Sequence, residues 1–231
     1  MTTELAAPTQ FPRSRRGKNL ALLTGSTAMD NAESSVTSVL FPLMREAMGL
    51  SSAALGTIVA VAKAVGVFTA IPWAFLARRY SRKSVLAICS GFWGVWVILA
   101  GFSGSFTQFL VLYAIGAAGF AGAGSIALSI LGDLYEDARR GRATGLVYGG
   151  VAVITGATAP IFGLLSRFED GWRYGYIITG AICIAIGVLI MLFLDDPEPG
   201  DAPAQTTTDD LGSKARFWRE GIRELLAIKT F

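Results

Sequence analysis

The chain is 231 residues long, 52% hydrophobic and only 16% charged, with a formal net charge of +3. The charged fraction is well below the roughly 25% typical of soluble domains, and the charges are concentrated in short segments. Between these segments lie apolar stretches of about 20 residues, long enough to cross a hydrocarbon core of about 30 Å. These features exclude an ordinary water-soluble fold and predict an integral membrane protein.

The composition also limits the chemistry that the chain can perform. It has no histidine, so the commonest metal ligand and the usual general base are missing. Cys89 and Cys183 lie inside apolar runs without companion ligands, which predicts no disulfide, no metal site and no cofactor. The cations form no separate basic domain, so a nucleic-acid partner is not expected. No nucleophile with a base is recognisable, and an enzyme is not predicted.

Residues 1–19 are predicted to form a cytoplasmic tail, because they contain Pro8, Pro12 and four cations but no signal-peptide cleavage site. Residues 20–194 then contain six apolar runs. Only helices fit these runs, since they lack the alternation of barrel strands and a backbone in lipid must satisfy its own hydrogen bonds. The predicted fold class is all-α, a polytopic transmembrane bundle of about six spans: 20–44, 52–77, 85–102, 106–131, 143–165 and 172–194.

The first two spans carry charge near their middle. Asp30 and Glu33 are three residues apart and therefore share a helix face, and Asn31 adds an amide group between them. Lys63 lies near the middle of the second span. A charge at that depth costs roughly 3 kcal/mol or more, so it normally faces a cavity or a partner. These four residues are predicted to serve substrate binding and proton coupling; a static ion pair joining the two spans is the alternative.

Small residues crowd the fourth and fifth spans. Lipid gives helices no hydrophobic reason to associate, so glycine and alanine predict close helix contacts. A proline in the fifth span removes a backbone hydrogen bond and permits a bend. Ordinary packing and a flexing gate helix both fit the candidate packing or hinge residues, which are Gly145, Gly149, Gly156, Pro160 and Gly163.

Residues 195–231 are predicted to form a cytoplasmic linker. Its start is acidic and rich in proline, and a polar run follows. From Lys214 onward, apolar residues such as Trp218 and Ile222 recur at helical spacing, which predicts an amphipathic helix on the membrane surface. A tether that leads directly into another span fits equally well. In either case we expect the chain to continue into a second half.

The distribution of cations predicts the orientation in the membrane. Most of the 20 Lys and Arg residues fall in the tail, after the second and fourth spans, and after the sixth. The opposite side carries only Arg45, Arg167 and Arg173. Because cytoplasmic loops are enriched in Lys and Arg, both ends of this chain are predicted to be cytoplasmic, in a plasma (inner) membrane.

The loop after the second span, residues 74–86, resembles the signature loop of the major facilitator superfamily, G-x-L-A-D-R-x-G-R-K-x-x-L. Arg78 stands where that family has an aspartate that helps to close the cytoplasmic side, which reverses the charge. Ala74 and Ser81 replace two expected glycines. The matching residues are Leu76, Ala77, Arg79, Arg82, Lys83 and Leu86.

A second segment is similar to the same family. Asp133 resembles the acidic exit from the fourth span, and residues 139–145 resemble the Arg-Gly-x-Ala entry into the fifth. Trp172-Arg173 at the start of the sixth span is another familiar feature. The resemblance implies a cytoplasmic gate of charged residues that breaks and reforms during transport: Arg78, Arg79, Arg82, Lys83, Asp133, Arg139 and Arg142.

The resemblance implies a secondary active transporter of a small solute that works by alternating access, with substrate held near the bilayer midplane between two six-helix halves. Proton coupling through Asp30 and Glu33 is a hypothesis that goes with it. The implied partners are a small-molecule substrate, the lipid bilayer, protons and the second half. The alternative is a six-helix half-transporter, channel or accessory subunit that acts as a homodimer.

Overall fold

The computed structural model describes residues 13–135 and 137–194. The predicted linker, residues 195–231, and the first twelve residues of the predicted tail lie outside this range. The first helix begins at Arg13, so it includes the last residues assigned to the tail. The described residues contain helices and no strands, which confirms the all-α fold class.

The helices make six crossings, and each corresponds to one predicted apolar run. Several crossings are built from two or three consecutive helical segments that differ in hydrogen-bonding pattern. The segments are α1 (Arg13–Met48), α2 (Ala53–Arg79), α3 (Arg82–Leu86), the π-helix η1 (Ala87–Phe92), α4 (Gly94–Gly101), α5 (Phe106–Phe120), α6 (Ala123–Leu134), α7 (Asp137–Gly163), the 3₁₀-helix η2 (Leu164–Arg167) and α8 (Gly171–Phe193).

Five of the crossings in the described part are long and apolar enough to span a bilayer: 53–79, 82–101, 106–134, 139–167 and 171–193. The remaining crossing is α1, which comes first in the chain. It is 36 residues long, which is enough to span a bilayer. It is less apolar because Asp30, Glu33 and several hydroxyl side chains interrupt its hydrophobic sequence. The polarity of α1 therefore sets it apart from the other spans.

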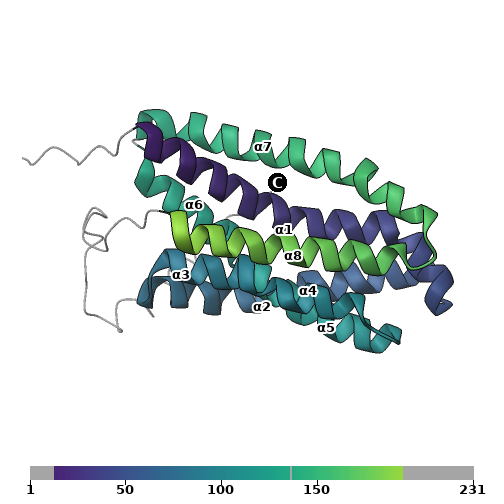
Figure 1. The fold of residues 1–231 in the computed structure, drawn as a ribbon. Helices are drawn as coiled ribbons and strands as arrows, with labels where there is room; N and C mark the ends of the chain where they lie inside the picture. The colour runs from purple at the N-terminus through teal and green to yellow at the C-terminus, as the bar shows by residue number, and fades with distance from the viewer. Residues whose placement is uncertain (1–12, 136, 195–231) are drawn as a thin grey trace, which may run out of the picture. The chain divides into compact units, whose positions relative to one another are not determined.

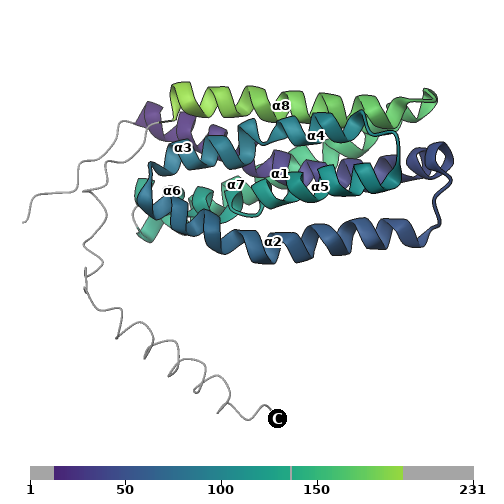
Figure 2. The ribbon, with the colours of Figure 1, turned by 90° about the horizontal axis from the view of Figure 1, so that it is seen from below.

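The crossings run lengthwise along one bundle, with α1 between α7 and α8 (Figure 1). The segment η1–α4 packs on α8, and α5 packs on both α4 and α2. Helix α2 lies at the edge of the bundle (Figure 2). Large apolar side chains of α2 remain exposed, among them Phe68 at 77% and Ile71 at 76%. One broad face of α2 is therefore uncovered within this unit.

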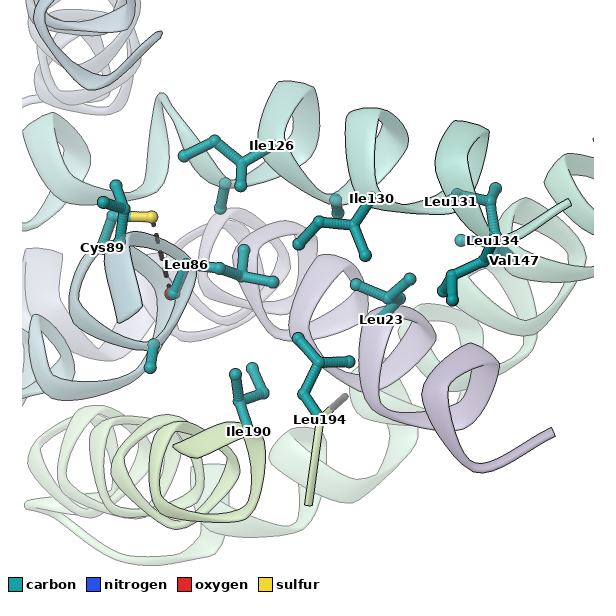
Figure 3. Packing of buried hydrophobic residues seen from close by; sticks show 14 of the residues in the cluster. Leu23, Leu86, Cys89, Ile126, Ile130, Leu131, Leu134, Val147, Ile190 and Leu194 are labelled. Atoms are coloured by element: carbon teal, nitrogen blue, oxygen red, sulfur yellow. Dashed lines mark hydrogen bonds between the residues drawn. The ribbon is translucent and has the colours of Figure 1, made fainter. Parts of the chain in front are cut away.

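Two apolar clusters hold the bundle together. One joins α1, α3, η1, α6 and α8 through residues such as Leu23, Leu86, Ile130 and Ile190 (Figure 3). The other lies nearer the opposite ends of these helices and is rich in aromatic rings, including Phe109 stacked on Tyr113 at 5.6 Å between ring centroids. Because lipid supplies no hydrophobic drive for helix association, such interlocking contacts stabilise the bundle by close packing.

Glycine residues allow the third and sixth crossings to approach until their backbones are in contact. A Cβ atom added to Gly91 of η1 would overlap Gly187 of α8, and one added to Gly180 would lie 2.6 Å from the carbonyl oxygen of Gly94. No larger residue fits without moving a helix. These contacts fix the position of η1 against α8, and with it the side chains that η1 directs toward α1.

The helix of the fourth crossing is interrupted between α5 and α6. Two tryptophans from other crossings donate hydrogen bonds to its backbone. The N–H of Gly122 donates to the carbonyl of Gly119 at 3.5 Å, whereas a regular α-helix would pair it with the carbonyl of Ala118. The carbonyl of Ala118 is therefore free to accept another hydrogen bond. Trp73 Nε1 donates to that carbonyl at 2.6 Å, and Trp93 Nε1 donates to the carbonyl of Ile115 at 2.6 Å. The close helix contacts predicted for the fourth span are thus made by indole rings from the second and third crossings.

Candidate functional site

The candidate site is centred on the two carboxyl groups of α1. Glu33 is 4% exposed and Asp30 is partly buried. Among the described residues, Asp30 Oδ2 and Glu33 Oε1 are buried without a hydrogen-bond partner. A buried polar oxygen without a partner is costly, and in a membrane span it marks a place where a proton or ligand would be stabilising.

Asp30 is held by hydroxyl groups from α1 and η1. Ser90 Oγ donates to Asp30 Oδ1 at 3.1 Å, and the hydroxyl oxygens of Ser90 and Ser26 are 2.6 Å apart. Ser90 lies in the π-helical segment, whose wider turn changes the direction of its side chains relative to a regular helix, a feature often found at functional sites. The hydroxyl chain orients one carboxylate oxygen and leaves the other unpartnered.

Glu33 lies beside a second cluster of polar side chains, which come from the first, fourth and sixth crossings. The hydroxyl of Tyr113 from α5 belongs to this cluster through its hydrogen bond with Thr37. Thr37 Oγ1 donates to the backbone carbonyl of Glu33 at 3.0 Å and lies 2.8 Å from the hydroxyl of Tyr176 on α8. It also lies 3.3 Å from the hydroxyl of Tyr113. Three hydroxyl groups therefore form a connected network next to the backbone of Glu33.

Four contributors to this site were not predicted from the sequence: Ser26, Ser90, Tyr113 and Tyr176. Ser90, Tyr113 and Tyr176 lie in apolar runs in which an isolated hydroxyl carries no distinctive pattern, and Ser26 is one of several hydroxyl residues in the first span. The one available signal was that a carboxyl group in a membrane requires donors from neighbouring spans. That signal predicts that donors exist and not which residues supply them.

A polar strip of α1 is exposed next to the two carboxyl groups. Asn31, Ser34 and Ser38 are exposed and lie at helical spacing on one face. Asn31 Nδ2 donates to the carbonyl of Thr27 at 2.7 Å, which leaves its side-chain oxygen for other contacts. The polar character of this strip distinguishes it from the apolar surfaces of the neighbouring crossings.

Lys63 is exposed on α2. Among the described residues it makes no ion pair with Asp30 or Glu33. The static ion pair that would join the first two spans is therefore not formed in this structure. Lys63 is an exposed cationic group on the helix that follows α1.

The predicted gate residues lie at the end of the bundle where α2 ends and α3 and α7 begin (Figure 1). Arg82 of α3 pairs with Asp133 of α6. Arg140 donates to the carbonyl of Gly132 at 3.0 Å. Within the described part of the chain, Arg142 forms no ion pair with Asp133. The remaining cations of the predicted gate line the same end, where Arg78, Arg79, Arg139 and Arg142 are exposed and Lys83 is half-buried.

The four α7 glycines predicted to pack or bend the helix face open space in this unit. A Cβ atom at Gly145, Gly149, Gly156 or Gly163 would meet no described atom within 4 Å. Pro160 lies in the last turn of α7, which continues into the 3₁₀-helix η2. These residues therefore do not form helix contacts inside the six-crossing unit, and they leave a smooth, uncovered face on α7.

Among the described residues, no group of three His, Cys, Asp or Glu side chains is arranged to hold a metal ion. The hydrogen-bond donors to Asp30 and Glu33 are hydroxyl groups, Ser90 to the carboxyl group of Asp30 and Thr37 to the backbone carbonyl of Glu33. This set suits proton transfer and the binding of a polar or charged organic solute.

Comparison with known proteins gives a consistent result. A family model described as the Major Facilitator Superfamily matches residues 20–231. The chain is 30% identical over 174 residues to a probable sulfoacetate transporter of Cupriavidus necator, a match that covers 75% of this chain and 40% of that protein. It is 27% identical over 204 residues to a probable 4-methylmuconolactone transporter of Cupriavidus pinatubonensis, covering 86% and 47%.

Solved structures show the same fold. A bacterial homologue of the human lysosomal transporter Spinster, in an inward-facing and unoccupied conformation, matches with a TM-score of 0.76 and 24% identity. The match covers 92% of this chain and 50% of that one. The chain thus spans about half, or less, of the length of these proteins.

Proposed function

Because the chain belongs to the Major Facilitator Superfamily, we propose that it forms the N-terminal half of a secondary active transporter that works by alternating access. The chain is an integral membrane protein, and its curated relatives carry the names of transporters and not of enzymes. The observation that carries the proposal is the pair of carboxyl groups in α1. They have buried, unpartnered oxygens, and they lie beside an exposed polar strip.

The uncovered faces of α2 and α7 would contact a second six-helix half. Phe68 and Ile71 on α2 and Val153 on α7 are more than 70% exposed. The exposed glycines of α7 would allow another helix to approach closely. In this arrangement the polar strip of α1 faces a cavity between the halves, at the depth where transporters of this kind hold substrate.

A small organic anion is the substrate class that we propose. Lys63 provides an exposed ammonium on α2, and Asn31, Ser34 and Ser38 provide hydrogen-bonding groups on α1. An ammonium together with neutral donors suits a carboxylate or sulfonate, since charge-assisted hydrogen bonds are stronger than neutral ones. The name of the probable sulfoacetate transporter agrees with this class.

Proton coupling would use Asp30 and Glu33. Each has one carboxyl oxygen without a hydrogen-bond partner among the described residues. Hydroxyl groups bind the carboxyl group of Asp30 and the backbone carbonyl of Glu33. Protonation removes the charge and its cost in the membrane, while deprotonation restores an anion that attracts Lys63. Alternation between these states would couple a proton gradient to movement of the solute.

The charged end of the bundle would act as the cytoplasmic gate. The Arg82–Asp133 pair joins α3 to α6, with the side chains 34% and 27% exposed. A half-exposed pair is worth little to stability, about 0–1 kcal/mol, and can therefore be broken at low cost. This property suits a contact that must open and reform in each transport cycle.

The test uses the full-length protein in proteoliposomes, with radiolabelled sulfoacetate as the first probe and a neutral sugar as control. Asp30→Asn and Glu33→Gln should abolish uptake driven by a pH gradient, because neither amide can release a proton. Counterflow without a gradient should continue, because the cavity retains its shape.

Glu46→Gln is the matched control, since Glu46 is exposed near the end of α1. Undiminished gradient-driven uptake in both variants would overturn the coupling proposal. Sugar uptake without anion uptake would overturn the proposed substrate class.

A further inference from the structure

A groove lies between the first turns of α1 and the last turns of α8, away from the carboxyl groups of the candidate site. It has a volume of about 370 Å³, which falls in the range of about 300–1,000 Å³ typical of ligand sites. Both helix ends lie at the same end of the bundle (Figures 1 and 2). Its lining residues are Lys18, Ala21, Leu22, Gly25, Ile186, Leu189 and Phe193.

The spacing of the lining residues makes the groove a trough along the two helices. The α1 residues at positions 18, 21, 22 and 25 share one helix face, as do the α8 residues at 186, 189 and 193. From position 18 to position 25 the trough follows α1 for about 10 Å. Ala21 and Gly25 create its depth, because neither extends a side chain far into the space between the helices.

The chemistry of the trough changes along its length. Its walls are apolar except for Lys18, which lies toward the outer end of the trough, nearest the start of α1. An apolar trough that ends at a lysine matches a molecule with a hydrocarbon chain and an anionic head.

We propose that this groove binds one anionic phospholipid, with an acyl chain along the trough and the phosphate group at Lys18. The occupant is a membrane lipid and not a soluble anion, because an isolated phosphate would leave the apolar walls unfilled. The charge also favours an anionic lipid, since cations at the membrane surface attract anionic headgroups and basic pockets between helices bind them.

Such a lipid would link α1 to α8 at one end of the helix that carries Asp30 and Glu33. The contact would lie outside the proposed substrate cavity, because the trough faces α8 and the polar strip of α1 is uncovered. The site would therefore be independent of the transported solute, and the inference holds whichever substrate the protein carries.

Native mass spectrometry of the full-length protein can test the site. The protein would be titrated with dioleoylphosphatidylglycerol or with dioleoylphosphatidylcholine, which have the same acyl chains and differ in net charge. We expect one phosphatidylglycerol to bind about fivefold more tightly than phosphatidylcholine, the preference expected from one surface cation. Inorganic phosphate should not displace it.

Two variants separate charge from shape. Lys18→Gln should remove the preference for phosphatidylglycerol while leaving phosphatidylcholine binding unchanged. Gly25→Leu should weaken binding of both lipids about tenfold by filling the trough; a Cβ atom at Gly25 lies 3.8 Å from Ile186 Cδ1, so the backbone need not move.

Arg45→Gln and Leu192→Phe are the controls, since Arg45 is an exposed cation at the other end of α1 and Leu192 is an exposed residue of α8 outside the trough. Neither should change lipid binding. Equal affinity of the wild-type protein for both lipids, or no effect of Lys18→Gln, would overturn the proposal.

Discussion

Thr37 connects three crossings through a single hydroxyl group. Its Oγ1 atom lies 3.0 Å from the backbone carbonyl of Glu33, 3.3 Å from the hydroxyl of Tyr113 and 2.8 Å from that of Tyr176. A hydroxyl has one proton and two lone pairs, so Thr37 can donate to the Glu33 carbonyl or to the Tyr113 hydroxyl while it accepts from Tyr176. Thr37 thereby positions the aromatic residues next to the Glu33 carboxyl group.

Replacement of Thr37 by Val should destabilise the protein by about 1–3 kcal/mol, because the two phenols lose a buried partner while the volume stays nearly constant. The measurement is thermal unfolding of the detergent-solubilised protein. Ser38→Ala is the control, since Ser38 is exposed and its hydroxyl donates only to the carbonyl of Ser34. Equal losses in the two variants would argue against a connecting role for Thr37.

At the scale of elements, the fourth crossing depends on the fit between glycine and tryptophan. The indole of Trp73 lies over Gly122 and that of Trp93 over Gly119, and the two rings meet edge to face at 5.4 Å. Their N–H groups bind carbonyls next to the interruption between α5 and α6. The interruption is therefore stabilised by neighbouring crossings and not by its own sequence.

Gly122→Ala should destabilise the protein by about 1–3 kcal/mol, the usual cost of overpacking, because the new Cβ atom would overlap Trp73. Gly124→Ala, two residues further along, should change stability by no more than about 0.5 kcal/mol, since no atom lies within 4 Å of its Cβ position. Denaturation of both variants in the same detergent provides the comparison. A tolerated Gly122→Ala would show that Trp73 does not pack as described.

At the scale of the whole molecule, the charged residues divide the bundle into two ends. The end that contains the Arg82–Asp133 pair carries most of the cations, and the other end carries Arg45, Arg167 and Arg173. Arg173 is held there by the carbonyls of Gly101 and Ser103. By the positive-inside rule, we propose that the first end is cytoplasmic.

Cysteine labelling in intact cells would test this orientation. Ser166→Cys should react with a membrane-impermeant maleimide, whereas Tyr80→Cys should react only after the cells are permeabilised, because the two positions lie at opposite ends of the bundle. Cys89 and Cys183 are buried, so background labelling should be low. Labelling of Tyr80→Cys and not Ser166→Cys in intact cells would reverse the assignment.

Much of the fold could be predicted because each crossing is determined locally. An apolar run in lipid must form its own hydrogen bonds, so runs such as 52–77 and 172–194 predict α2 and α8 to within a few residues. The candidate site was only partly predictable. Asp30 and Glu33 stand out because charge is rare in a span, whereas Ser90 and Tyr176 are ordinary residues until other crossings bring them to α1.

The sequence by itself determined that this is an all-helical membrane protein of about six crossings, with carboxyl groups inside its first helix, because hydropathy and buried charge depend on residue type and not on neighbours. Only the tertiary structure decided that Ser90 meets Asp30, that Tyr113 and Tyr176 meet at Thr37, and that Lys63 forms no ion pair within the described unit. Those contacts join residues that are far apart in the chain, so they depend on which helix faces pack together. Small residues such as Gly91 and Gly187 determine this packing, because they lie where the helices approach most closely.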